Sequence, residues 1–447
     1  MHTPDLACPR VCSVRIVARL VAVRELLTTR DFRFLLSVRL VGQSGDGMLQ
    51  AALATFVLFS PERQPDAVKV AASFAILLIP YSVIGPFAGV FLDRWSRRQV
   101  LVRANLLKAL FVLPILALVA AGNDGPILGI AVLVVLGIGR FVLAGISASL
   151  PHVVSGRDLV TANALTPTAG TIMSAVGALV GVTLARIVGG GDTGSVVVLA
   201  IAAIAYIAAS TIARPIGRKR LGPDGSKPSD SVRGVVLGLV SGIRELRVHA
   251  EAGRAVTVVA CHRIALGVLT VGGLLLVRNT FQTMEQADAA LGMFAVLTGA
   301  TAVGALIGAV LTPGATRRWG TVPWSTFVLL QAGIVGTAFV LLGSQLPAYA
   351  PLLLGALSLG FCGQSLKVCS DTLIQRFVPD DHLGRVFALF DMIVNVTLVL
   401  GVTAMAFLAP ASGQAPLAYL TVGVLLICAG LWYRWRGPRR VRVSNDA

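Results

Sequence analysis

The sequence predicts an all-α membrane protein with twelve transmembrane helices in two six-helix repeats. Three observations lead to this prediction. The chain has 447 residues, of which 55% are hydrophobic and only 13% are charged, whereas soluble domains carry roughly 25% charged residues. Long apolar runs recur along it, and basic residues gather between them. The runs are too long and too continuous for the alternating strands of a β-barrel.

Twelve apolar runs approach the roughly 20 residues that a helix needs to cross the hydrocarbon. We expect spans at approximately 33–59, 67–92, 99–121, 126–150, 160–188, 194–213, 254–277, 287–312, 321–344, 349–376, 385–409 and 413–434. A polar segment rich in glycine, proline and basic residues interrupts them, and its part 232–252 has the weakly amphipathic pattern of a helix on a membrane surface. The predicted domains are a cytoplasmic N-terminal segment 1–32, a six-helix bundle 33–213, a cytoplasmic linker with an amphipathic helix 214–253, a second six-helix bundle 254–434 and a cytoplasmic tail 435–447.

The distribution of basic residues predicts the orientation. Lysine and arginine are concentrated before residue 33, at 94–98, in 214–253 and after residue 433. Positively charged loops stay on the cytoplasmic side, so both termini are predicted to be cytoplasmic in a multi-pass protein of the bacterial inner membrane. The net charge of +17 does not indicate a nucleic-acid partner, because the arginines alternate with apolar spans instead of lining one polar face.

The sequence shows no pattern typical of an enzyme or of a bound cofactor. Cys8 and Cys12 have the spacing Cys-x3-Cys but no downstream cysteine or histidine pair to complete a zinc site, so no metal is expected. We found no nucleotide-binding loop, nucleophile elbow or dinucleotide fingerprint. We therefore expect no catalytic residues and no cofactor, and any driving energy should come from an ion gradient.

The two halves of the chain resemble each other weakly. Matching residues keep a nearly constant separation, which favours duplication over chance similarity of apolar sequence. Two parallel repeats with a site between them are a common architecture of transporters. The matching landmarks are Gly85 and Gly304, Gly89 and Gly308, Arg39 and Arg263, and the inner-loop segments 154–159 and 378–383.

The most specific pattern ends the second predicted span and reads Gly85-Pro86-x2-Gly89-x3-Asp93-Arg94-x2-Arg97-Arg98. Charges packed between two apolar runs mark a short turn at a membrane surface, and the two glycines allow close helix approach. This pattern resembles motif A of the major facilitator superfamily, and the resemblance implies the major facilitator fold. It also implies a conformational gate formed by Gly85, Gly89, Asp93, Arg94, Arg97 and Arg98.

In that gate, the resemblance places Asp93 against the N-terminal end of span eleven, near residues 382–385. A carboxylate is favoured there by the helix dipole, and a contact made in one conformation and broken in another biases the equilibrium between them. The alternative for the arginines is purely topological, since Arg94, Arg97 and Arg98 also keep the loop on the inner side.

Further patterns resemble the drug:proton antiporter branch of that superfamily, which includes macrolide effluxers and the enterobactin exporter. The second-half copy of motif A departs from the first, with Thr312 and Pro313 where the first has Asp93 and Arg94. Span five reads Gly177-Ala178-Leu179-Val180-Gly181 without the proline usual in antiporters. The matching residues are Arg30-Asp31-Phe32-Arg33, Gly45-Asp46, Leu159, Ala162-Asn163, Gln375, Pro379 and Gly384-Arg385-Val386-Phe387.

Asp46 is the main candidate for proton coupling or substrate contact. It lies near the middle of span one with polar neighbours that include Gln43 and Gln50. An acid inside a membrane span is costly and therefore faces the protein interior, where it can exchange a proton or pair with a cationic substrate. The alternative is a structural acid that braces span one against a neighbouring helix. The equivalent residue of the second half is Thr270.

Other polar residues inside spans are weaker candidates. Arg140 lies mid-span in helix four and could pair with Asp46. Asp391 and Asn395 share one face of span eleven and either line a cavity or bond to a neighbouring helix. Four basic residues closer to predicted inner helix ends are expected to extend their charged heads toward the surface, namely Arg39, Lys108, Arg263 and Lys367.

The resulting prediction is a secondary active transporter that exports amphipathic or cationic small molecules in exchange for protons. The expected partners are the substrate, protons and the lipid bilayer, with no nucleic acid, and the expected state is a monomer. Two alternatives stay open: a dedicated exporter of a siderophore or lipid-like metabolite, and a non-transporting membrane scaffold or sensor with the same fold.

Overall fold

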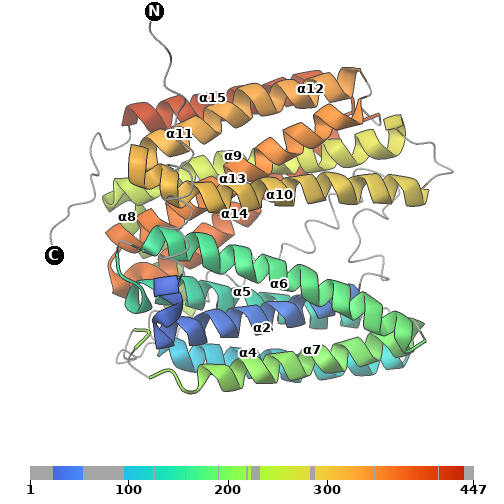
Figure 1. Ribbon diagram of the computed structural model, residues 1–447, viewed down its shortest axis with the longest axis vertical. Helices are drawn as coiled ribbons and strands as arrows, with labels where there is room; N and C mark the ends of the chain where they lie inside the picture. Colours follow the sequence, from blue (N-terminus) through green and yellow to red (C-terminus); the bar gives the residue numbers. More distant parts are fainter. Residues whose placement is uncertain are drawn as a thin grey trace, which may run out of the picture.

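The computed structural model consists of two helical bundles that meet at one end and diverge toward the other (Figure 1). It describes residues 24–53, 95–123, 126–156, 158–189, 191–217, 220–222, 232–281, 287–346, 348–410 and 412–436. Within these ranges every regular element is helical and no strand occurs. This confirms the predicted all-α membrane fold.

The first bundle contains five described helices. Long helix α2 packs against α6 and α7, while α4 packs against α5 and α7. The second predicted span, 67–92, lies outside the described residues. The helices of this bundle are α2 (Arg30–Leu53), α4 (Arg97–Ala120), α5 (Pro126–Val153), α6 (Leu159–Ile187) and α7 (Gly191–Ala213).

The second bundle repeats this pattern, with α10 packed on α13 and α9 packed on α13, α14 and α15. Two π-helical turns, η3 and η5, interrupt its helices, so that α9 continues into η3 and α11 continues through η5 into α12. Its elements are α9 (Ala250–Leu276), η3 (Val277–Phe281), α10 (Ala287–Trp319), α11 (Thr321–Gln331), η5 (Ala332–Gly336), α12 (Thr337–Gln345), α13 (Tyr349–Phe377), α14 (Asp380–Leu408) and α15 (Pro416–Arg436).

Ten helices of the described chain are long and apolar enough to cross a membrane. Each coincides with a predicted span, to within about five residues except at α10, which runs seven residues past its predicted end at 312. The boundary between α11, η5 and α12 falls inside the single span Thr321–Gln345. Helix α2 occupies the first predicted span but is more polar, because it carries Arg39, Gln43 and Asp46 among its apolar residues.

The linker between the bundles forms helix α8 (Val232–Val248), which packs on α14 and α9. Leu246 is buried in the core of the second bundle, whereas Val240, Ile243 and Val248 are exposed apolar side chains on another face of the helix. Such a face is typical of a helix at a membrane surface. We call the end of the molecule that carries α8 and the N-terminus of α14 the linker side.

Helices α2 and α6 cross at very close range through glycine. A methyl group at Gly177 would lie 2.1 Å from the backbone oxygen of Ser44, and one at Gly47 would lie 1.9 Å from the backbone oxygen of Ser174. The glycine-rich segment of span five therefore sets the distance between these two helices, as small residues do in membrane helix pairs.

Gly177→Ala should force α2 and α6 apart and lower stability by about 1–3 kcal/mol, the usual cost of an overpacked core. The measurement is the apparent melting temperature of the purified protein in detergent. Gly181→Ala is the matched control, because its added methyl would mainly meet side chains, at 3.1 Å from Val198 and 3.2 Å from Ala51. Equal melting temperatures for both variants would contradict the close crossing.

Candidate functional site

Arg97 closes the contact between the bundles on the linker side. It begins α4, is fully buried (0% exposed) and donates from Nη2 to Oδ1 of Asp380 at 2.9 Å. Its Nη1 donates to the backbone oxygens of Ala148 (2.9 Å) and Leu221 (3.0 Å). Nε2 of His152 lies 3.2 Å from the other oxygen of Asp380. Because Asp380 begins α14, the helix dipole adds to the attraction for this acid.

A second ion pair joins the bundles with the charges reversed, because its arginine comes from the second bundle and its acid from the first. Arg317, in the last turn of α10, lies 3.6 Å from Asp158, the residue that precedes α6. Its Nη2 also approaches the hydroxyl of Thr161 at 3.4 Å. Arg376 donates to the backbone oxygen of Gly156 at 3.1 Å. Each bundle thus contributes one arginine and one acid to these two ion pairs. We call the Arg97–Asp380 and Arg317–Asp158 contacts together the linker-side closure.

Behind these ion pairs lies an amide pair that joins α6 to α13. The side chains of Asn163 and Gln375 bond to each other in both directions, and Nδ2 of Asn163 also donates to Thr372 at 3.2 Å. Nε2 of Gln375 reaches the backbone oxygen of Ser147 on α5 at 2.8 Å. These buried bonds extend the contact between the bundles inward from the surface.

The predicted gate is described only in part. Of its residues, Gly85, Gly89, Asp93 and Arg94 lie outside the described residues, whereas Arg97 and Arg98 are placed. Arg98 donates to the backbone oxygen of Arg214 at 2.6 Å, which is a contact within the first bundle. Arg97 contacts the N-terminal end of α14, and the contact of Asp93 with that end, which the resemblance implies, stays a prediction.

The second-half copy of the motif has a packing role. The hydroxyl of Thr312, which is fully buried, accepts a hydrogen bond from the indole of Trp324 at 3.1 Å. This bond ties α10 to α11 within the second bundle. The replacement of an acid by threonine at this position is thus accounted for by a local partner.

A cluster of charged side chains lies between the bundles, further from the linker-side end of the molecule than the linker-side closure. Arg39 of α2 interacts electrostatically with Asp371 on α13 and Asp391 on α14, and Arg263 of α9 interacts with the same two acids. Arg39 and Arg263 are the repeat-related pair identified in the sequence. We call this set the central charge cluster, formed by Arg39, Arg140, Arg263, Lys367, Asp371 and Asp391.

The acid at the core of the cluster is held by a neighbour one helical turn away. Nζ of Lys367 contacts both carboxylate oxygens of Asp371, at 3.0 and 2.8 Å, and lies 5.3 Å from the ring centre of Phe390. Asp371 is only 1% exposed. Nε of Arg39 donates to Gln43 at 2.9 Å, and Arg39 is buried. The expectation that Arg39 extends toward the surface is therefore wrong.

Arg263 differs from the other cations of the cluster. Its Nε is buried and has no hydrogen-bond partner within the described chain. A guanidinium presents five N–H donors in a planar fork that matches a carboxylate or phosphate. An arginine placed at the contact of two bundles with unfilled donor capacity is therefore suited to receive an anionic group.

The remaining predicted site residues have less specific surroundings. Arg140 lies on α5 and interacts electrostatically with Arg39 and Arg263. Asn395 is buried and donates to the backbone oxygen of Asp391 at 2.7 Å, which is a bond within α14. Gln50 is exposed on α2. The structure brings Arg140 and Asp391 into the central charge cluster and leaves Gln50 and Asn395 without a demonstrated role.

Asp46 lies elsewhere, inside the first bundle. Its Oδ1 accepts hydrogen bonds from Nζ of Lys108 on α4 and from the hydroxyl of Tyr206 on α7, the latter at 2.8 Å. Nζ of Lys108 also lies 4.0 Å from the centre of the Tyr206 ring. Lys108 is 2% exposed, so the expectation that it extends toward the surface is wrong: it is paired in the core. The three side chains brace α2 against α4 and α7.

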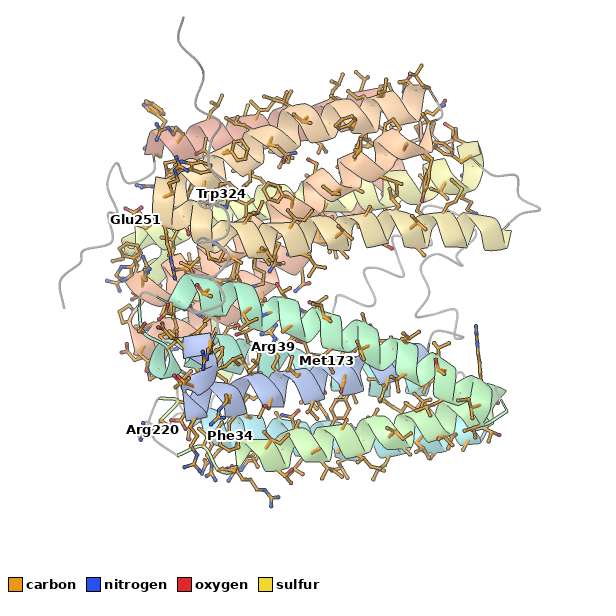
Figure 2. The ribbon with its side chains drawn as sticks, viewed as in Figure 1. Phe34, Arg39, Met173, Arg220, Glu251 and Trp324 are labelled. Atoms are coloured by element: carbon orange, nitrogen blue, oxygen red, sulfur yellow. The ribbon has the colours of Figure 1, made fainter. Side chains whose placement is uncertain are left out.

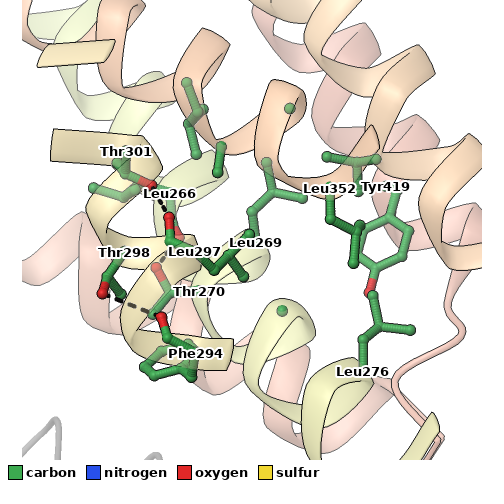
Figure 3. Close-up of a pocket in the computed structure, with 15 residues that line it drawn as sticks. Leu266, Leu269, Thr270, Leu276, Phe294, Leu297, Thr298, Thr301, Leu352 and Tyr419 are labelled. Atoms are coloured by element: carbon green, nitrogen blue, oxygen red, sulfur yellow. Dashed lines mark hydrogen bonds between the residues drawn. The ribbon is translucent and has the colours of Figure 1, made fainter. Parts of the chain in front are cut away.

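The second bundle has a cavity where the first has this triad. Thr270, the counterpart of Asp46, bonds to the backbone oxygen of Leu266 on its own helix at 2.7 Å. It lines a cavity of about 60 Å³ whose walls are mainly apolar. Figure 3 shows Leu352, Tyr419 and Leu276 on one side of this space and Leu297 with neighbouring residues on the other. The two repeats have thus diverged at this position.

Several of these residues were not identified from the sequence as parts of a site. For Asp371 a signal existed, because Lys367 and Asp371 stand four residues apart within an apolar span, the spacing of a helical ion pair. For Tyr206 and Asp380 no local signal existed, since their partners come from distant parts of the chain.

Comparison with known proteins agrees with this geometry. The sequence model described as Major Facilitator Superfamily matches residues 286–447. An uncharacterised MFS-type transporter of Mycobacterium tuberculosis is 35% identical over 412 residues, which is 91% of this chain and 91% of that protein. An uncharacterised MFS-type transporter of Bacillus subtilis is 24% identical over 410 residues, covering 90% and 91%.

Solved structures share the fold at low identity. A bacterial homologue of the iron transporter ferroportin, in its outward-facing state, has a TM-score of 0.66 at 19% identity, with 91% of this chain and 100% of that chain covered. The transporter FucP in its outward conformation has a TM-score of 0.67 at 14% identity, with 91% and 98% covered. Helix topology and the long match to the mycobacterial relative lead to one conclusion: the chain is a multi-pass membrane protein that belongs to the Major Facilitator Superfamily of transporters.

Proposed function

We propose that this chain is a secondary active transporter that exports an amphipathic small molecule in exchange for protons, and that its substrate binds at the central charge cluster. The observation that carries the proposal is the composition of that cluster, to which α2 and α5 contribute from one bundle and α9, α13 and α14 from the other. A site shared between two repeats is exposed to alternate sides when the repeats rock against each other.

The proposed orientation follows from the basic residues of the linker side, which is assigned to the cytoplasm of a bacterial inner membrane. The linker-side closure then corresponds to a state shut toward the cytoplasm. Opening requires both the Arg97–Asp380 and the Arg317–Asp158 contacts to separate. The Asn163–Gln375 amide pair must separate with them.

The cluster favours a substrate that carries an anionic group. The cluster contains four cations but only two acids. Of these acids, Asp371 already contacts Lys367 through both of its oxygens. The buried Nε of Arg263 has no partner within the described chain. We propose an anionic group in preference to the cationic one predicted from Asp46, because Oδ1 of Asp46 already accepts bonds from Lys108 and Tyr206.

Proton coupling is proposed at Asp371. This acid is buried at the contact of the bundles, where loss of its charge on protonation would free Lys367 to move. Ionisable residues buried in membrane spans commonly serve as proton relays. Protonation of Asp371 would thereby link the ion gradient to the arrangement of the same cluster that holds the substrate.

The test is transport by the purified full-length protein in liposomes under an imposed pH gradient. The panel consists of fluorescent amphipathic compounds that share one apolar body and carry an anionic, neutral or cationic head. We expect gradient-dependent movement of the anionic member above that of the others. Movement of the cationic member alone would overturn the substrate class, and no movement of any compound, siderophore or lipid-like metabolite would favour the scaffold alternative.

Arg263→Gln should reduce transport of the anionic compound by at least about tenfold, since a hydrogen bond to a charged group contributes about 1.5–3 kcal/mol. Arg263→Lys should recover part of the loss, because it restores the charge without the planar fork. Arg244→Gln, which changes an arginine on the exposed side of α8, is the control and should transport normally. Equal rates for the 263 and 244 variants would remove Arg263 from the site.

A further inference from the structure

A groove of about 890 Å³ runs between α10, α11 and α13 in the second bundle. This volume lies within the roughly 300–1,000 Å³ typical of sites for small organic molecules. The central charge cluster and the linker-side closure contribute only one residue to its lining, Arg317. Its lining includes Leu311, Arg317, Arg318, Trp319, Phe327 and Phe361.

The walls of the groove are aromatic and apolar. Trp324, which lies in the upper bundle of Figure 2, is nearly fully buried and forms the centre of an aromatic group. Its ring centre lies 5.8 Å from that of Trp319, 5.5 Å from that of Phe327 and 5.8 Å from that of Phe361. Trp319 is 54% exposed and Phe327 is 52% exposed, so the group offers a broad apolar surface to an occupant.

One end of the groove is basic. Arg317 and Arg318 end α10 on the linker side, and both are exposed. Arg318 lies 5.9 Å from the ring centre of Trp319 and forms no ion pair within the described chain. A tryptophan beside arginines at a helix end marks the interface between headgroups and hydrocarbon. The charge therefore sits where a lipid headgroup would lie.

The length of the groove matches a single leaflet. Its lining on α10 runs from Ile307 to Trp319, about 18 Å at 1.5 Å per residue, which is slightly more than half of the roughly 30 Å hydrocarbon core. The groove thus combines an apolar channel one leaflet deep with two guanidinium groups at its mouth. Basic pockets between membrane helices on the cytoplasmic side are suited to anionic lipid headgroups.

We infer that this groove binds one anionic phospholipid, with its phosphate on Arg317 and Arg318 and an acyl chain along Phe327 and Phe361. Arg317 also faces Asp158 of the other bundle at 3.6 Å. A bound phosphate at Arg317 competes with that acid, so the lipid weakens one of the two ion pairs of the linker-side closure. The site is independent of the transported molecule.

The test is native mass spectrometry of the purified full-length protein titrated with phosphatidylglycerol and with phosphatidylcholine of identical acyl chains. We expect a first equivalent of phosphatidylglycerol to bind more tightly than phosphatidylcholine. Arg318→Gln should weaken that binding about fivefold, since one arginine near the surface contributes about 1 kcal/mol. Leu311→Trp, which enlarges a side chain in the wall of the groove, should also reduce it.

Arg436→Gln is the matched control. Arg436 lies 5.5 Å from the ring centre of the exposed Trp435, so it has the same arginine–tryptophan chemistry without the groove. Equal effects of the 318 and 436 variants, or equal affinity for the two lipids, would overturn the proposal. Competition by inorganic phosphate as effective as by the lipid would also overturn it, because it would show that the groove contributes nothing. Arg318→Gln keeps the test decisive if Leu311→Trp fails to fold.

Discussion

Arg97→Gln is expected to open the linker side of the transporter and to abolish most of its transport. The substitution removes the ion pair with Asp380 and three bonds to backbone oxygens, those of Ala148, Leu221 and Asp380. Loss of one partner from a buried pair costs about 3–5 kcal/mol. Asp380 is 42% exposed, so solvent compensates part of that loss, and we expect about 2 kcal/mol.

The measurement is the distance between spin labels on the two bundles, attached at the exposed positions Arg103 of α4 and Asp381 of α14 in a background without reactive cysteines. We expect longer distances in the Arg97 variant. Arg98→Gln serves as the neighbouring control, because the contact described for Arg98 stays within the first bundle. An unchanged distance distribution in Arg97→Gln would show that other contacts hold the bundles together.

Lys108→Met is expected to destabilise the protein by about 3–5 kcal/mol, because it leaves Asp46 in a bundle core without its partner. The double variant Asp46→Asn/Lys108→Met should recover most of that stability. It replaces a buried ion pair by a polar and an apolar side chain, and such replacements are often close to neutral. Tyr206 can still donate to the amide oxygen at position 46. The measurement is the thermal unfolding, in detergent, of the wild type, the single variant and the double variant.

The same pair of variants separates the two roles considered for Asp46. Its partners lie on α4 and α7, inside the first bundle, so we expect transport to return together with stability in the double variant. Recovery of the melting temperature without gradient-driven transport would instead assign Asp46 to proton coupling. If the double variant is as unstable as Lys108→Met, the stability that is lost does not come from an unpaired Asp46 alone.

The helices could be predicted from the sequence because hydrocarbon imposes a minimum length and excludes charge. The same physics explains where the prediction fell short. Helix α10 continues through Pro313 to Trp319, beyond the predicted end at 312, because a helix does not have to stop where the apolar run stops. Helix α14 begins at Asp380, ahead of the predicted 385, for the same reason.

The partners of charged residues could be predicted only within one helix. Lys367 and Asp371 follow a known helical spacing. The contacts of Lys108 with Asp46 and of Arg97 with Asp380 depend instead on the rotation and neighbours of helices far apart in the chain. Depth along a span indicates that a charge needs a partner, but it does not indicate which helix supplies it.

The crossed ion pairs of the linker side bear on the ancestry of the fold. One bundle contributes Arg97 and Asp158, and the other contributes Asp380 and Arg317. The spacing of the matching landmarks aligns Arg97 with Thr316 and Asp158 with His382, so the two ion pairs do not join equivalent positions of the repeats. The closure is two-fold symmetric in the sense of its charges but not in its residues. The two pairs are therefore not copies of one ancestral pair, and a change in one does not require the matching change in the other.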